Sequence, residues 1–140
     1  MTSLDKDVLA ERIAAVERHL QRVAQKLPAH ASLLSVGSDA SDSVILHLWQ
    51  AVQIVIDLGT ALCVQRNLGV PTTYRDAFER LRAAGIIDDG LALRLAGAAG
   101  FRNVVAHAYE TIDMARVYEA ASNGPADLRE FLRIVRDLRS

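Results

Sequence analysis

Cysteine, proline and aromatic residues are scarce in this sequence, and their scarcity excludes several kinds of protein. The 140 residues include one cysteine, three prolines and 5% aromatic residues. The single Cys63 excludes an internal disulfide and a metal site built from several cysteines. A net charge of −1 gives no overall sign of nucleic-acid binding, so any such site has to be local. A chain that is 51% hydrophobic with so few prolines is typical of a folded helical protein.

The sequence also lacks the features of an exported or membrane-spanning protein. Residues 1–13 contain no apolar segment of the kind found in signal peptides. Residues 43–65 are long and apolar enough to span a membrane, but polar residues recur there at spacings of three and four and form one stripe on a helix. We therefore expect a central helix, no membrane association, and a cytoplasmic protein with a single domain over residues 1–140. The stripe comprises His47, Gln50, Gln53, Asp57 and Thr60.

Apolar spacing predicts an all-α fold, a helical bundle of five to six helices with the second and fourth in the middle. Apolar residues between 9 and 27 alternate at spacings of four and three, which indicates a heptad seam. No segment shows the alternation typical of a β-strand. The expected boundaries are a first helix ending at Pro28, a loop over 28–42, a helix over 43–65, a helix from Thr72 or Thr73 to Gly85, and a fourth from Asp88 or Asp89 through 102–109.

The C-terminal region is expected to contain two further helices. Asp113 is placed to open a short fifth helix. Asn123 and Gly124 predict a turn, and Pro125 suits the first position of a last helix.

The stretch RNVVAHAY, residues 102–109, places four polar side chains on the predicted fourth helix. With about 100° per residue and Arg102 at zero, Asn103 lies at roughly 100°, His107 at roughly 140° and Tyr109 at roughly −20°. Ala106 lies in the middle of this arc, while the apolar residues of the stretch point to the other side. On a regular helix the Tyr109 hydroxyl therefore projects from the same face as Arg102.

These side chains suit phosphodiester chemistry without a metal. Arginine offers a fixed, charged fork for phosphate oxygens, and histidine transfers protons near neutral pH. Arg102 and His107 therefore predict cleavage of RNA by its own 2′-hydroxyl, with Asn103 as a positioning residue. Because such cleavage needs both a base and an acid, one histidine per chain favours a symmetric homodimer. No carboxylate pair or histidine cluster indicates a metal hydrolase.

Simpler interpretations stay open for each of these residues. The four polar residues are also consistent with an exposed helix face. Asp57 is either a partner that supports the site or an acid paired with an arginine. For the remaining candidates we expect structural roles: His47 as a core histidine bonded to a neighbour, Trp49 as a core or dimer contact, and His19 and His30 as surface residues.

The segment GFRNVVAHAY resembles the signature of the HEPN superfamily, an arginine followed by four to six residues and a histidine. The tyrosine two places further on resembles the HepT-like group, in which an aspartate commonly stands where this chain has Ala108. The resemblance covers roughly residues 43–121, because three other segments follow the family's order. They are QAVQIVIDLGTAL (50–62), GVPTTYRDAFERLRAAGII (69–87) and ETIDMARVYE (110–119).

The resemblance implies a HEPN-like bundle that dimerises around the motif helix. It implies the toxin of a type VII toxin–antitoxin pair, a metal-independent ribonuclease without a cofactor. Arg102 and His107 would be catalytic, with Asn103 and Asp57 in support. The expected antitoxin is an MntA-like minimal nucleotidyltransferase, which silences the toxin by transferring AMP to Tyr109. Beside Arg102, that adduct would occupy the phosphate site.

Two other functions are compatible with the same residues. The protein could be a non-catalytic module that holds nucleotide or RNA for a nucleotidyltransferase partner. Alternatively, it could be a structural dimer in which the motif maintains the interface. A ribonuclease assay with a His107→Ala blank separates the first of these from an enzyme.

Overall fold

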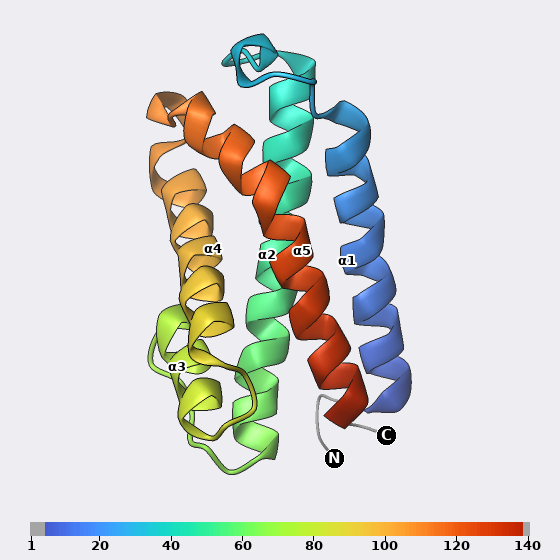
Figure 1. Ribbon diagram of the computed structural model, residues 1–140, viewed down its shortest axis with the longest axis vertical. Helices are drawn as coiled ribbons and strands as arrows, with labels where there is room; N and C mark the ends of the chain where they lie inside the picture. The colour runs from blue at the N-terminus through green and yellow to red at the C-terminus, as the bar shows by residue number, and fades with distance from the viewer. Residues whose placement is uncertain (1–4, 139–140) are drawn as a thin grey trace.

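The structure is a computed structural model that describes residues 5–138, and all regular secondary structure in that range is helical. This confirms the predicted all-α fold (Figure 1). The helices are α1 (Lys6–Lys26), α2 (Asp39–Gln65), α3 (Tyr74–Ala83), α4 (Asp89–Ala108) and α5 (Met114–Leu138), with short 3-10 helices η1 (Ala31–Leu33) and η2 (Tyr109–Thr111).

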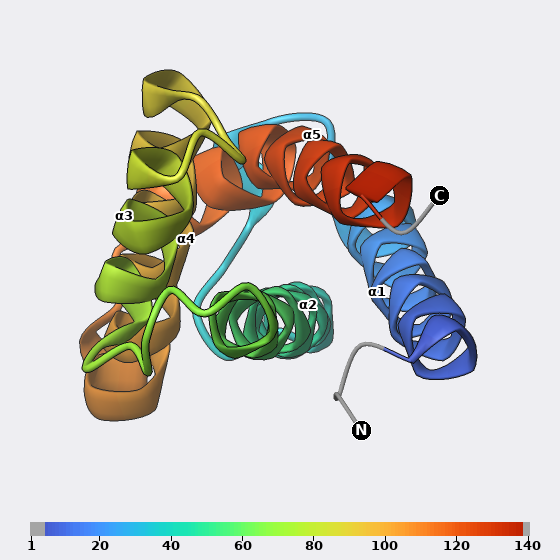
Figure 2. The same ribbon diagram turned by 90° about the horizontal axis from the view of Figure 1, so that it is seen from below.

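Helix α2 is the centre of the bundle, as the sequence predicts. It packs against α1, α3, α4 and α5, and Figure 2 shows α1, α4 and α5 around three of its sides, with the fourth side open. Among residues 5–138 it is the one helix long and apolar enough to cross a membrane, and 50% of its apolar window is buried inside the protein. Packing against four helices accounts for this apolar character. The polar stripe from His47 to Thr60 lies on its half-buried and exposed side.

The prediction that the fourth helix also lies in the middle is wrong. Helix α4 packs against α2, α3 and α5, but its outer side is uncovered, and Leu93 and Val104 are exposed there. Many residues of α4 are alanine or glycine, so its apolar composition reflects close packing on one side rather than burial all round.

Side-chain caps set the beginnings of α2, α3 and α4, as Asp5 does for α1. The Thr73 hydroxyl accepts from the backbone N–H of Asp76 at 3.0 Å, and the Asp88 carboxylate accepts from that of Leu91 at 2.7 Å, which confirms two predicted caps. Helix α2 begins at Asp39 rather than at Ser43, because Ser38 provides the cap. The predicted loop over 28–42 is therefore too long.

The C-terminal region is one continuous helix, so the predicted turn at Asn123–Gly124 is wrong. Helix α5 begins directly after Asp113, as expected, and continues through Pro125 to Leu138. Proline within a helix removes one hydrogen bond and costs about 3 kcal/mol. Apolar residues on both sides of Pro125 keep a single buried face in register, and their burial offsets this cost. That face comprises Val117, Ala121, Leu128, Phe131, Leu132 and Val135.

Close packing of two phenylalanine rings on a glycine fixes α2 and α3 relative to α5. Helices α2 and α3 are the ones that contact the motif. The rings of Phe78 and Phe131 meet edge to face, with centroids 5.8 Å apart. Gly59 of α2 lies beneath them, and a Cβ at this position would stand 3.2 Å from the Phe78 ring. Glycine here lets the three helices approach closely.

Candidate active site

The motif lies on the last two turns of α4 and extends just beyond its end. The helix is regular through His107, so Arg102 and His107 point about 140° apart around its axis. At Ala108 the backbone turns out of the helical conformation, with φ −143° and ψ 37°. Tyr109 consequently belongs to η2 and not to α4. The motif therefore has a helical part and a separate tyrosine.

Arg102 is half-buried and held by side chains from two other helices. Its Nε donates a hydrogen bond to Gln53 Oε1 at 2.7 Å. Its guanidinium carbon lies 5.6 Å from the ring centroid of Trp49 on α2 and 5.1 Å from that of Tyr74 on α3. Such cation–π contacts contribute about 0.5–2 kcal/mol each. Its Nη1 also reaches Asn103 Oδ1 at 3.4 Å.

Asp57 is connected to the motif through Gln53. Gln53 Nε2 donates to Asp57 Oδ1 at 3.0 Å, while the Oε1 of the same amide accepts from Arg102. Each atom of the Gln53 amide is thus used once, which fixes its orientation. Asp57 supports the arginine through Gln53 and forms no direct ion pair with it.

Tyr109 lies away from Arg102, so the predicted placement of its hydroxyl beside the arginine is wrong. The hydroxyl donates to the Asp42 carboxylate in the first turn of α2. Asp42 and Gln53, the contacts of Tyr109 and Arg102, are separated by about 16 Å along the axis of α2. The hydrogen bond that Tyr109 donates to Asp42, followed by burial and the carboxylate charge, raises the pKa of Tyr109 to about 12. The side chain is 40% exposed.

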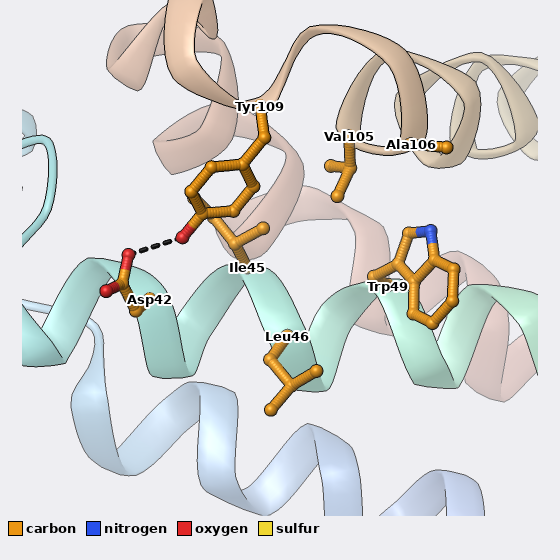
Figure 3. Close-up of a pocket in the computed structure, with 7 residues that line it drawn as sticks. All are labelled: Asp42, Ile45, Leu46, Trp49, Val105, Ala106 and Tyr109. Carbon is orange, nitrogen blue, oxygen red and sulfur yellow. Dashed lines mark hydrogen bonds between the residues drawn. The ribbon is translucent and has the colours of Figure 1, made fainter.

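A cleft of about 450 Å³ lies between the end of α4 and the first half of α2. Figure 3 shows Tyr109 and Asp42 at one end of it and Trp49 at the other, with Ile45 between them on α2. The Trp49 Nε1 is buried and has no hydrogen-bond partner among the described residues. The volume is in the range of small-molecule sites. The cleft is lined by Asp42, Ile45, Leu46, Trp49, Val105, Ala106 and Tyr109.

His107 and Asn103 are both exposed one turn apart on α4, as the helical spacing predicts. Neither side chain is buried by the rest of the protein, so both are accessible to a ligand or to a second subunit. Within residues 5–138, no group of three or more histidine, cysteine or carboxylate side chains is arranged to hold a metal ion.

A larger groove of about 890 Å³ lies between α4 and α5. It contains none of the four polar motif residues. Its charged lining mixes Arg94 and Arg116 with Asp113, Glu119 and Asp127, so charges of both signs face the same space. We assign the site to the smaller cleft and the adjoining Arg102 because Tyr109 lines this cleft and Trp49, at its other end, contacts Arg102.

Several contacts of the site were not predicted from the sequence. Asp42 falls in the predicted loop, Tyr74 belongs to no polar motif, and the sequence predicts Trp49 as a core or dimer contact. The interpretation of His47 as a histidine bonded to a neighbour is confirmed, since its Nδ1 lies 2.9 Å from Nδ1 of His19. His19 is consequently half-buried rather than a simple surface residue, while His30 is exposed as expected.

The fold and motif together define the HEPN class: an all-α bundle with arginine and histidine on one helix. A family model described as ribonuclease HepT-like matches residues 16–135, and the chain belongs to this family. A curated relative, the mRNA nuclease HepT of Shewanella oneidensis, is 26% identical over 130 residues, 93% of this chain and 97% of the relative.

Solved structures of similar proteins agree with this assignment. A tri-AMPylated HEPN toxin of Shewanella oneidensis in complex with an MNT antitoxin superposes with a TM-score of 0.85 and 26% identity, covering 95% of this chain and 99% of the toxin. A chain in a toxin–antitoxin complex named MntA–HpeT superposes with a TM-score of 0.82 and 26% identity, covering 94% and 99% of the two chains. The HEPN-like form of the predicted bundle is confirmed.

Proposed function

We propose that this protein is a cytosolic RNA-cleaving toxin that a nucleotidyltransferase antitoxin silences by adding AMP to Tyr109. The observation that carries the proposal is the Arg102 guanidinium, fixed by Gln53 and two aromatic rings on the helix that also presents His107. Family membership and the names of the relatives, an mRNA nuclease and an AMPylated toxin, support the same function.

In the proposed reaction, Arg102 binds the scissile phosphate and stabilises the charge that develops on it. The ribose 2′-oxygen attacks the neighbouring phosphorus, and the bond from phosphorus to the 5′-oxygen breaks. His107 transfers protons, as base to the 2′-hydroxyl or as acid to the leaving oxygen. Asn103, bonded to Arg102, positions the guanidinium. The products are a 2′,3′-cyclic phosphate and a 5′-hydroxyl, and no metal takes part.

We further propose a homodimer in which two motif helices contribute to one site. Each chain has one motif histidine, and His107 points away from Arg102 on its own helix. A second copy supplies a second proton-transfer group. The uncovered outer side of α4 leaves room for such a partner.

Cleavage of RNA by the purified protein in the presence of EDTA tests this function. We expect a 2′,3′-cyclic phosphate product, and we expect His107→Ala to lower the rate by about 10²- to 10⁴-fold. His30→Ala, which changes an exposed histidine far from the motif in sequence, is the matched control and should cleave normally. If EDTA abolishes cleavage, or if His107→Ala retains the parent rate, the proposal is wrong. RNA binding without any cleavage would instead favour the non-catalytic module.

A further inference from the structure

The Tyr109 hydroxyl and the Asp42 carboxylate form a pair that RNA cleavage does not use. The hydroxyl donates to Asp42 Oδ1, and Figure 3 shows the two side chains meeting at one end of the cleft. They come from segments far apart in the sequence, which Figure 1 places at the same end of the bundle. Their meeting is therefore a product of the tertiary fold and not of local sequence.

Asp42 is accessible and lies at a helix end that suits a carboxylate. It lies in the first turn of α2, which Ser38 caps, and the positive end of a helix dipole favours a negative charge there. Its side chain is exposed, and Tyr109 is 40% exposed beside it. A second protein can thus reach the hydroxyl while the hydroxyl donates its hydrogen bond to Asp42.

We propose that Asp42 is a catalytic residue for the modification of Tyr109, the base that accepts the phenol proton during nucleotide transfer. This inference rests on the proposed function, in which the antitoxin supplies ATP and its divalent cation. The Tyr109 oxygen forms a bond to the α-phosphorus of ATP, the bond from that phosphorus to the bridging oxygen breaks, and pyrophosphate leaves. The proton passes from Tyr109 to Asp42 and then to water. The toxin thereby contributes a base to its own inactivation.

The Tyr109 hydroxyl is such a weak acid that its reaction with ATP needs a base. The contact with Asp42 raises the pKa of Tyr109 to about 12, so very little phenolate forms spontaneously near neutral pH. Proton transfer has to accompany attack on phosphorus, and the carboxylate already in contact with the hydroxyl is placed to receive the proton.

Because Asp42 raises the pKa of Tyr109, the direction in which the modification rate changes on replacing Asp42 shows whether Asp42 is the base. Asp42→Asn keeps an acceptor for the hydroxyl but cannot take up a proton at its amide, and it returns the pKa of Tyr109 toward its ordinary value of 10.0. If acidity of the phenol alone controlled the reaction, Asp42→Asn would be modified faster. If Asp42 is the base, Asp42→Asn is modified more slowly although its phenol is more acidic.

The experiment measures the rate of AMP addition by intact mass, using the full-length protein, its cognate nucleotidyltransferase, ATP and magnesium. We expect Asp42→Asn to slow modification about tenfold or more, and Asp42→Glu to recover part of the rate. Asp39→Asn removes the same charge from the same helical turn without contacting Tyr109, and it should leave the rate within about twofold. Helical content by circular dichroism verifies that each variant is folded.

The dependence of the rate on pH distinguishes a base from a positioning contact. Between about pH 6 and 9 the parent should vary little, whereas Asp42→Asn should accelerate as phenolate forms with rising pH. A loss below tenfold in Asp42→Asn, or an equal loss in Asp39→Asn, overturns the role of Asp42. If the parent itself gains no AMP, the proposed silencing of Tyr109 fails, which is a separate result from normal modification of Asp42→Asn.

Discussion

The two ends of the motif are held in opposite ways. At one end, Arg102 is half-buried and contacts side chains from two helices: Gln53, Trp49 and Tyr74. At the other end, the helix has stopped, Tyr109 is 40% exposed, and its hydroxyl is bonded to Asp42. The residue that we propose to bind the phosphate is thus anchored on several sides. The residue that we propose to receive AMP stands on a short turn beyond the helix.

This difference changes how silencing would work. The sequence-based expectation was that an AMP on Tyr109 would lie directly on the Arg102 phosphate site. In the structure the two side chains contact α2 at positions about 16 Å apart along its axis. The cleft between them, lined by both Tyr109 and Trp49, is the route by which an adduct could extend toward the arginine. Silencing then requires an adduct long enough to reach Arg102 across the cleft, because Tyr109 itself does not lie beside the arginine.

The largest expected loss of RNA cleavage comes from a substitution that keeps the charge of Arg102 but removes its contacts. Arg102→Lys retains a cation but cannot reproduce the planar fork that bonds Gln53 and lies between two rings. We expect RNA cleavage to fall by about 10²-fold, close to the loss from removing a transition-state donor. Arg22→Lys, on the exposed surface of α1, is the control. Normal cleavage by Arg102→Lys would mean that charge alone suffices and that the anchoring is irrelevant.

A smaller effect is expected from the hydrogen-bonded support behind the arginine. Gln53→Leu preserves bulk but removes both the acceptor for Arg102 and the link to Asp57. We expect kcat to fall by about tenfold with KM little changed, because the guanidinium stays present but loses its orientation. Gln50→Leu, on the same polar stripe, should have little effect, and Asp57→Asn should lie between the two. A pure KM effect would assign Gln53 to RNA binding instead.

The smallest expected effect is on stability, at the end of the polar stripe where His47 contacts His19 of α1. Burial, and then the charges of His47 and Arg18, holds the pKa of His19 below its ordinary value of 6.5. The unfolded chain therefore binds more protons than the folded one as pH falls through that value, so stability decreases toward acid.

Melting temperatures measured at about pH 7.5 and pH 5.5 check this expectation. The parent should lose stability on acidification, and His19→Gln should lose less, by a degree or two at most. An equal loss in both proteins would place the acid sensitivity elsewhere. Because this contact lies on the α1 side of α2, it provides a comparison for variants that act on the motif side.

Local signals in the sequence were sufficient for much of this fold. The heptad seam of α1, the caps at Thr73 and Asp88, and the polar stripe of α2 are all visible in residue spacing, and the structure has each of them. The proline at 125 misled the prediction, because turn residues usually mark a break unless a buried face continues on both sides of them.

The site itself was only partly predictable, for a physical reason. Arg102 and His107 lie on one helix, and helical geometry alone relates them. The contacts of Arg102 with Tyr74 and of Tyr109 with Asp42 join residues from different helices, so only the packed structure brings them together. The end of the helix at Ala108 depends on two backbone angles, and no pattern of residue spacing predicts them.

We propose that a single motif both cleaves RNA and carries the tyrosine through which the antitoxin silences it. The most direct measurement is the rate of RNA cleavage as a function of the fraction of protein modified, read by intact mass, for the parent and for Tyr109→Phe. We expect parent cleavage to decline in proportion to AMP on Tyr109, while Tyr109→Phe cleaves at a similar initial rate, gains no AMP and stays active. Silencing of Tyr109→Phe by the antitoxin and ATP, or full cleavage by modified parent protein, would show that Tyr109 is not the switch.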